Sequence, residues 1–260
     1  MRRGILAIVI LDLKRFWLDR ARIVAGLVQP LLYLFVLGAG LGASSRMGGA
    51  DYRRYIFAGT MGLSMLFAAT FAAISIVFDR QIGFFKAILV APVPRSAIAL
   101  GKIIAGALQA LMQGVVLLPF AYLAGTPFSV LGMAGALAAM TLSALAFATI
   151  GVAFACRFTS TTVFPVVSNA ILLPMFFLSG GLYPLDAAPP WMKIAAQFDP
   201  VAYAIDLIRG ALLGRFHFPI LQSVGALILT IAILAFEAVR IFSRGEDDSS
   251  LGATRFTWRS

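Results

Sequence analysis

Charged residues are scarce in this sequence of 260 residues, at 12%, whereas 61% of the residues are hydrophobic. Soluble domains carry about 25% charged residues, so the composition excludes an ordinary soluble domain and indicates a membrane protein. The few charges are also unequal, with 21 Lys and Arg against 11 Asp and Glu, a net charge of +10. In so apolar a chain this excess favours anionic lipid headgroups, and not nucleic acid, as the partner.

Groups that usually carry catalysis or bind metals are almost absent. Cys156 is the only cysteine and His217 the only histidine. The sequence therefore has no intrachain disulfide and no pair of such residues for a metal site or for a nucleophile with its base. The phosphate-binding motif G-x-x-x-x-G-K-[ST] is also missing, so there is no P-loop. We expect no cofactor bound by this chain.

Long uncharged stretches are present instead, and a helix needs roughly 20 apolar residues to cross a bilayer. The longest stretch, between Lys102 and Arg157, is long enough for two crossings and is divided by a Gly-Thr-Pro turn. Helices are expected because lipid leaves no unpaired backbone group tolerable. The predicted fold class is an all-α membrane protein, a single domain over 1–260 with spans at about 23–43, 55–78, 103–123, 130–156, 160–182 and 217–236.

The distribution of basic residues predicts the orientation of these helices. With the N-terminus inside, fifteen of the 21 Lys and Arg residues fall in inner segments and six in outer segments. Basic residues are enriched in cytoplasmic loops, so both termini, including the tail 240–260, are predicted to be cytoplasmic. None of the predicted spans contains Asp, Glu, Lys or Arg. This disfavours a proton- or ion-driven transporter, which keeps an ionisable group at mid-membrane.

The segment 4–22 is predicted to form an amphipathic helix in the membrane interface. Its charged residues recur at helical spacing on one face and its apolar residues on the other, with Trp17 at headgroup depth. A simple anchor before the first span is an equally good interpretation. The charged face holds Asp12, Arg15, Asp19 and Arg22, and the apolar face holds Leu6, Val9, Leu13, Phe16 and Trp17.

The inner loop 79–95 is predicted to dock onto a partner. It contains the short apolar run "GFFKAILV", which looks helical and is closed by Pro92 and Pro94. An apolar helix that faces the cytoplasm needs a surface to bury it. A helix lying on the membrane surface is the alternative.

The outer segment 183–215 contains two short helical patterns that are too short to cross the bilayer and too apolar to lie freely in water. We predict re-entrant helices, with two surface helices as an equally weighted alternative. Asp199 is predicted as an N-cap and Gly214 as a C-cap. Asp206 and Arg209 lie three residues apart and are expected to pair.

The span before this outer segment has features of a hinge. Two prolines within it each remove a backbone hydrogen bond, and two glycines at its outer end permit a tight bend. Together with the capped start of the next helices, this predicts an external gate. Its residues are Pro165, Pro174, Gly180, Gly181, Asp199 and Pro200.

Two motifs resemble those of a known family. Residues 78–102, "FDRQIGFFKAILVAPVPRSAIALGK", are similar to a coupling stretch written D-R-E-x-G-x-x-x-E-x-L-x-x-P-x-x-R. Residues 174–214, "PMFFLSGGLYPLDAAPPWMKIAAQFDPVAYAIDLIRGALLG", are similar to the signature F-L-S-G…P…P…N-P…Y…R, with Asp199 in the usual place of Asn. Both belong to the type-2 permeases of ATP-binding-cassette exporters, the group that includes nodulation-factor and daunorubicin exporters. The likeness of "LSGG" to the signature of the cassette ATPases is accidental.

The resemblance implies a transmembrane permease subunit in the inner membrane of a bacterial or archaeal cell. It would pair, as a homodimer or heterodimer of permeases, with two copies of an ABC ATPase subunit that binds ATP and Mg²⁺. The expected substrate is amphipathic, lipid-linked or a hydrophobic drug. The residues implied to couple the ATPase to transport are Asp79, Arg80, Gly83, Phe84, Phe85, Ile88 and Arg95.

A membrane-embedded lipid-modifying enzyme or assembly factor is the alternative. It predicts acids, bases or metal ligands clustered at one membrane depth. Serines of the spans, such as Ser64 and Ser168, have no evident base beside them in the sequence. We therefore favour the permease and expect no enzymatic activity of the chain itself.

Overall fold

The structure is a computed structural model, and it describes residues 2–40, 49–82, 94–126 and 130–244. Within these ranges every regular element is a helix and no strand occurs, which confirms the all-α fold class. The chain order is α1 (Arg2–Leu18), α2 (Arg20–Leu32), the π-helix η1 (Tyr33–Leu37), α3 (Gly38–Gly40), α4 (Gly49–Ala72), α5 (Ile74–Gln81), α7 (Arg95–Leu117), α8 (Phe120–Leu123), α9 (Val130–Ala155), α10 (Val163–Leu178), the 3₁₀ turn η2 (Leu185–Ala187), α11 (Pro190–Phe198), α12 (Pro200–Leu213) and α13 (Ile220–Arg244).

Helix α9 forms the centre of the bundle and packs against α4, α7, α12 and α13. Its sequence is rich in Ala and Gly, and such small residues let helix backbones approach closely in a membrane. A methyl group added at Gly151 would lie 2.8 Å from Cα of Thr70 in α4. The crossing of α9 and α4 therefore depends on the missing side chain of a glycine.

Four helices are long and apolar enough to cross a membrane: Asp51–Gln81, Ser96–Leu117, Gly132–Ala155 and Ile220–Phe242. A fifth span results if Arg2–Leu18 and Ile23–Leu37, which meet at a bend of 78°, count as one. Helix α10 covers only the 16 residues Val163–Leu178, fewer than the predicted span 160–182. The helical nature of the predicted spans holds, and by length and composition the described residues support four or five of the six predicted crossings.

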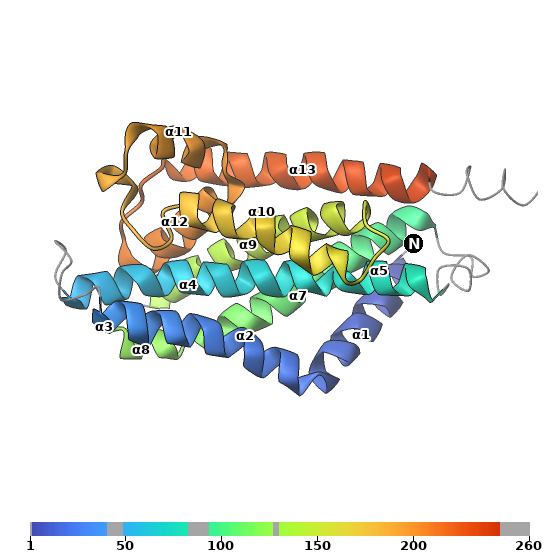
Figure 1. The fold of residues 1–260 in the computed structure, drawn as a ribbon, viewed down its shortest axis with the longest axis horizontal. Helices are drawn as coiled ribbons and strands as arrows, with labels where there is room; N and C mark the ends of the chain where they lie inside the picture. The colour runs from blue at the N-terminus through green and yellow to red at the C-terminus, as the bar shows by residue number, and fades with distance from the viewer. Residues whose placement is uncertain (1, 41–48, 83–93, 127–129, 245–260) are drawn as a thin grey trace, which may run out of the picture.

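The two ends of the bundle differ in what they contain (Figure 1). The start of α1, the end of α5 and the end of α13 lie together at one end, and α3, α8, α11 and η2 lie at the other. We call the first the inner end and the second the outer end, after the orientation predicted from the basic residues. Helix α12 is buried along most of its length and runs beside α9, with Ser143 donating to the carbonyl of Ala204 at 3.4 Å. The outer segment thus sends one helix back into the bundle and leaves α11 on its surface, where Trp191 and Phe198 are exposed.

The prediction for 4–22 requires a correction. The helix ends at Leu18, and its buried residues are Val9, Asp12 and Phe16, so the face that packs on the protein includes a charge. Leu6 and Trp17 of the predicted apolar face are exposed on the protein surface, so the correction concerns Asp12 and the end of the helix. The physical reason is that α1 packs across α7, which supplies a partner for the buried carboxylate of Asp12.

Candidate functional site

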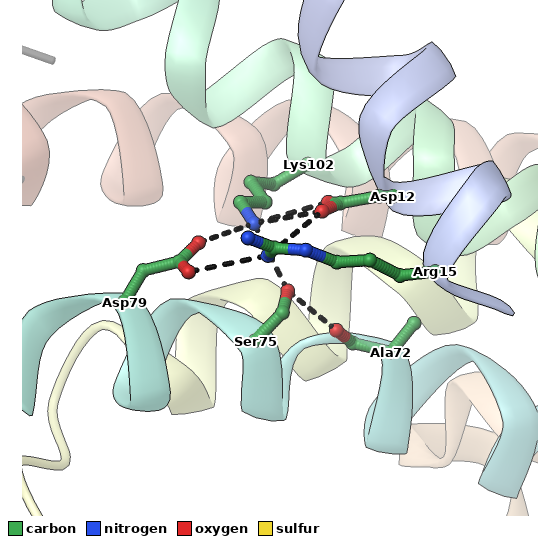
Figure 2. A network of polar contacts seen from close by, with 6 residues as sticks. All are labelled: Asp12, Arg15, Ala72, Ser75, Asp79 and Lys102. Atoms are coloured by element: carbon green, nitrogen blue, oxygen red, sulfur yellow. Dashed lines mark hydrogen bonds and ion pairs between the residues drawn. The ribbon is translucent and has the colours of Figure 1, made fainter. Parts of the chain in front are cut away.

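At the inner end of the bundle, four charged side chains form what we call the inner charge cluster, Asp12 and Arg15 of α1, Asp79 of α5 and Lys102 of α7 (Figure 2). Nζ of Lys102 lies 3.0 Å from Oδ2 of Asp12 and 2.9 Å from Oδ2 of Asp79. It also donates to Oγ of Ser75 at 3.0 Å. Nη1 of Arg15 donates to Oδ1 of Asp79 at 3.2 Å. Two acids and two bases therefore balance within one group.

Three of the four side chains of this cluster are buried, so that the stability of the fold depends on their pairing. The side chains of Asp12 and Lys102 are 5% exposed and that of Asp79 is 2% exposed, whereas that of Arg15 is 43% exposed. Removing one partner of such a buried pair leaves an uncompensated charge and costs about 3–5 kcal/mol. The cluster therefore holds α1, α5 and α7 in one arrangement, with Arg15 as its accessible edge.

The residues that follow Asp79 attach the end of α5 to the connection between α9 and α10. Arg80 donates from Nη1 to the carbonyls of Cys156 at 3.1 Å and Phe158 at 3.2 Å. Nε2 of Gln81 donates to the carbonyl of Thr159 at 2.9 Å. The chain thus enters residues 83–93 from a helix end that is anchored on several sides.

These contacts show where two of the predicted coupling residues, Asp79 and Arg80, lie in the bundle and what they bind. The charged groups of Asp79 and Arg80 both have partners within this chain, and Asp79 is buried. A direct pairing of Asp79 with the ATPase subunit, which the resemblance to the permease family implies, would require breaking the inner charge cluster. Arg95 begins α7, and Gly83, Phe84, Phe85 and Ile88 lie outside the described residues.

At the opposite end, four residues form what we call the outer clamp: Tyr55 of α4, Gly180 and Gly181 after α10, and Arg209 of α12. The hydroxyl of Tyr55 lies 2.8 Å from the carbonyl oxygens of Gly180 and Tyr183. Nη2 of Arg209 donates to the carbonyls of Gly180 at 2.9 Å and Gly181 at 3.4 Å. The guanidinium carbon also lies 3.7 Å from the centre of the Tyr55 ring, a cation–π contact.

Two glycines, Gly180 in the outer clamp and Gly59 in the facing helix α4, make this bend possible for different reasons. Gly180 has φ +72°, a left-handed conformation that glycine adopts at little cost. A methyl group added at Gly59 of α4 would overlap the carbonyl oxygen of Gly181. The bend predicted at the end of this span is present, and α4 fits against it only because residue 59 has no side chain.

The predicted helix caps are confirmed. Oδ1 of Asp199 accepts from the backbone N–H of Val201 at 2.9 Å, Pro200 occupies the first turn of α12, and Gly214 ends the helix with φ 72°. Oδ2 of Asp199 is buried without a hydrogen-bond partner. Burial raises the pKa of the Asp199 carboxyl to about 7, and the Val201 bond offsets only part of that effect.

Two other expectations for this end need correction. No ion pair within 4.0 Å joins Asp206 and Arg209, because both carboxylate oxygens of Asp206 accept backbone N–H groups, from His217 at 2.9 Å and Phe218 at 3.0 Å. In α10, Pro165 lies in the first turn, where an N–H has no intrahelical partner to lose. Only Pro174, in the helix interior, removes a helical hydrogen bond.

The sequence patterns missed Lys102, Tyr55 and Arg209 as members of these two groups. In the sequence, Lys102 marks only the start of the longest uncharged stretch, although a lysine at one span boundary and an aspartate at another are able to pair. Tyr55 carries no such signal, because its partners are backbone carbonyls. Among the described residues no group of His, Cys, Asp and Glu is arranged to hold a metal ion.

Comparison with known proteins identifies the family. Residues 3–213 match the family model described as "ABC-2 type transporter". The chain is 34% identical over 228 residues to nodulation protein J of Rhizobium leguminosarum bv. trifolii, covering 86% of each chain. It is 27% identical over 235 residues to the "probable doxorubicin resistance ABC transporter permease protein DrrC" of Mycobacterium tuberculosis, covering 87% of this chain and 82% of that protein. With a family match over most of its length and a helical bundle of membrane-spanning length, the chain belongs to the ABC-2 type transporter family, as a multi-pass permease subunit.

Proposed function

We propose that this chain is the membrane subunit of an ATP-driven exporter that moves an amphipathic, lipid-linked or hydrophobic drug-like substrate out of the cytoplasm or the inner leaflet. Two permeases, identical or related, work with two copies of a separate ABC ATPase, which binds ATP and Mg²⁺. The name of one relative, a probable doxorubicin resistance ABC transporter permease, supports an ATP-driven transport role with a drug among the candidate substrates.

The observation that carries this proposal is the attachment of α5. This helix leads directly into residues 83–93, the segment that we propose as the ATPase-docking loop, with Gly83, Phe84, Phe85 and Ile88 in the contact. The ion pairs of Asp79 join α5 to α1 and α7, and Arg80 joins it to the α9–α10 connection. A displacement of the docking loop would therefore move several helices at once.

In the same proposal, the outer clamp is the closed state of an external gate. Gly180 and Gly181 form the bend, Pro174 weakens α10, and α12 with its Asp199–Pro200 start moves with them.

In the proposed topology, α10 and the bent α1–α2 pair complete six crossings, and both termini lie in the cytoplasm at an inner membrane. Protein fusions at residue 260 with a reporter that is active only in the cytoplasm test this orientation.

The test of the function is substrate-stimulated ATP hydrolysis by the purified complex of this chain with its ABC ATPase partner. We expect ATP hydrolysis to depend on the permease and to fall when Phe84 and Phe85 are both changed to Ser. Co-purification of the ATPase with this double variant at the wild-type yield, together with normal transport, would contradict the docking assignment.

A further inference from the structure

A cavity of about 300 Å³ lies at the outer end of the bundle, beside the outer clamp. Its walls come from the start of α4, from the segment around η2, and from α12 with the residues that follow it. The volume is at the small end of the range of ligand sites, roughly 300–1,000 Å³. The charged groups of the lining are three acids and three arginines, with His217 beside them: Asp51, Asp186, Asp206, Arg54, Arg209 and Arg215.

The three acids of this cavity already have partners in the chain. Oδ1 of Asp51 lies 3.5 Å from Nη1 of Arg54, and Oδ1 of Asp186 lies 3.1 Å from Nδ1 of His217. Both carboxylate oxygens of Asp206 accept backbone N–H groups. The positive charges that remain without an acidic partner therefore decide what kind of ligand the cavity attracts.

The first of these charges is the guanidinium of Arg209. It contacts the carbonyls of Gly180 and Gly181 and the ring of Tyr55, and none of these groups is an acid. Arg209 is only 5% exposed, and its Nε is buried with no hydrogen-bond partner among the described residues. Because a buried charge without a counter-ion is costly, this arrangement points to an anion that enters the cavity.

The second charge is Arg215, which lines the same cavity from the segment after α12. Its side chain is exposed, and the acids of the lining are engaged by other groups. Nε of Arg54, a third lining arginine, is likewise buried without a partner among the described residues. The cavity thus has one buried guanidinium, one exposed guanidinium at its rim, and donors that remain free.

The rest of the lining limits the size and charge of the ligand. Leu185, Leu213 and Phe216 provide apolar walls, which suit an apolar body. The three carboxylates of the lining repel a second negative charge, so an anion with a single charge is favoured. A carboxylate is planar and matches the donor fork of a guanidinium. A cavity of this volume holds a small molecule and not the two chains of a phospholipid.

We propose that this cavity binds a small, water-soluble monocarboxylate with an apolar body. The carboxylate accepts from Arg209 and pairs with Arg215, while the body lies against Leu213 and Phe216. Because Arg209 also binds the carbonyls at the bend, a ligand that compensates its charge stabilises the outer clamp. The ligand acts on the clamp from the outer end and is not the transported substrate, so this site goes beyond the proposed exporter function.

The probe for this site is para-fluorobenzoate, whose binding to the full chain in phosphatidylcholine nanodiscs is measured by fluorine NMR line width against empty nanodiscs. We expect a dissociation constant on the order of 1 mM, as so small a ligand allows, and competition by benzoate. The neutral para-fluorobenzamide and the dianionic para-fluorophenyl phosphate should bind about tenfold more weakly. Line widths equal to those with empty nanodiscs, or binding of the amide or the phosphate ester as tight as that of the carboxylate, would overturn the proposal.

The decisive variant is Arg215→Gln, because this exposed side chain is outside the outer clamp. The affinity for para-fluorobenzoate should fall about fivefold, the effect of losing one exposed ion pair, and the thermal midpoint without ligand should not change. The matched control is Arg53→Gln, an exposed arginine of the same end that does not line the cavity. Equal affinities in the two variants would refute a specific contact with Arg215.

Two further variants separate the buried charge from the space around it. Arg209→Lys keeps a positive charge but removes the free Nε–H group, so the affinity should fall about tenfold. Since this change also weakens the outer clamp, Leu213→Trp is measured beside it, because it fills the cavity and keeps every charge. We expect no binding to Leu213→Trp, and benzoate should raise the thermal midpoint of the wild type alone. Wild-type affinity of Leu213→Trp would refute this location.

These measurements use the permease without the ATPase, so this proposal and the exporter function fail separately. Binding of the carboxylate without ATP-dependent transport in the complete complex would count against the exporter. Transport by the complex without binding of the carboxylate would count against this site alone.

Discussion

The two ends of the bundle are held together by different chemistry. At the inner end, side-chain charges from three helices pair with one another, with Lys102 at the centre. At the outer end, Tyr55 and Arg209 bind backbone carbonyls at a pair of glycines, and the fit depends on Gly59. An ion-pair cluster is sensitive to the loss of charge, whereas a backbone clamp is sensitive to added volume. The comparison predicts which kind of substitution each end tolerates.

The largest effect is expected from Lys102→Met, which keeps the length of the side chain and removes its charge. Two carboxylates would remain buried with only Arg15 as partner, so the free energy of unfolding should fall by about 3–5 kcal/mol. The control is Arg157→Met, which breaks the half-exposed pair with Glu237 and should cost about 0–1 kcal/mol. Denaturation of the purified proteins in detergent measures both, and equal losses would remove the distinction between buried and exposed pairs.

A smaller but still large effect is expected from Gly59→Ala at the outer end. The added methyl group would meet the carbonyl of Gly181, and overpacking of this kind costs about 1–3 kcal/mol. Gly225→Ala in α13 is the matched control, since nothing lies within 4 Å of its added methyl group. The thermal midpoint should fall for the first variant and not for the second. A wild-type thermal midpoint for Gly59→Ala would show that α4 does not pack closely against the bend at Gly181.

The next smaller effect is expected from Gly214→Ala, which tests the cost of the left-handed backbone conformation in the absence of any steric overlap. No atom lies within 4 Å of an added methyl group, but the residue has φ +72°, which costs roughly 1–2 kcal/mol for an ordinary L-residue. Gly214→Asn should cost less, because Asn tolerates this region. If both variants unfold like the wild type, the end of α12 must rearrange freely.

The last prediction concerns pH at Asp199. Its folded pKa of about 7 lies above the ordinary aspartate value of 3.8, so the folded state keeps the proton that the unfolded state loses. The stability contributed by protonation is complete below the unfolded pKa and is lost as the pH rises through 7. Asp199→Asn should keep the cap and remove this dependence. Thermal midpoints at pH 5 and pH 8 test it, and an identical pH slope in both proteins would assign the dependence to another group.

Local features were predictable, and the pairing of distant groups was not. The caps at Asp199 and Gly214 and the bend at Gly180 follow from preferences of single residues, and all three are present. The polar face assigned to α1 was wrong at Asp12 because an amphipathic pattern assumes water on the charged side. The pairing of Asp206 with Arg209 failed for a similar reason, since backbone N–H groups of a later loop compete for the carboxylate.

The sequence by itself determined the all-helical membrane character, the short helices of the outer segment, and the absence of a P-loop, because these depend on composition and on spacing of a few residues. Only the tertiary structure decided that Asp12, Asp79 and Lys102 meet in one buried cluster, and that Gln109 and Gln113 are buried in the bundle. The physical reason is that a buried charge or amide is acceptable only with a partner, and that partner comes from a helix whose packing no local pattern reveals.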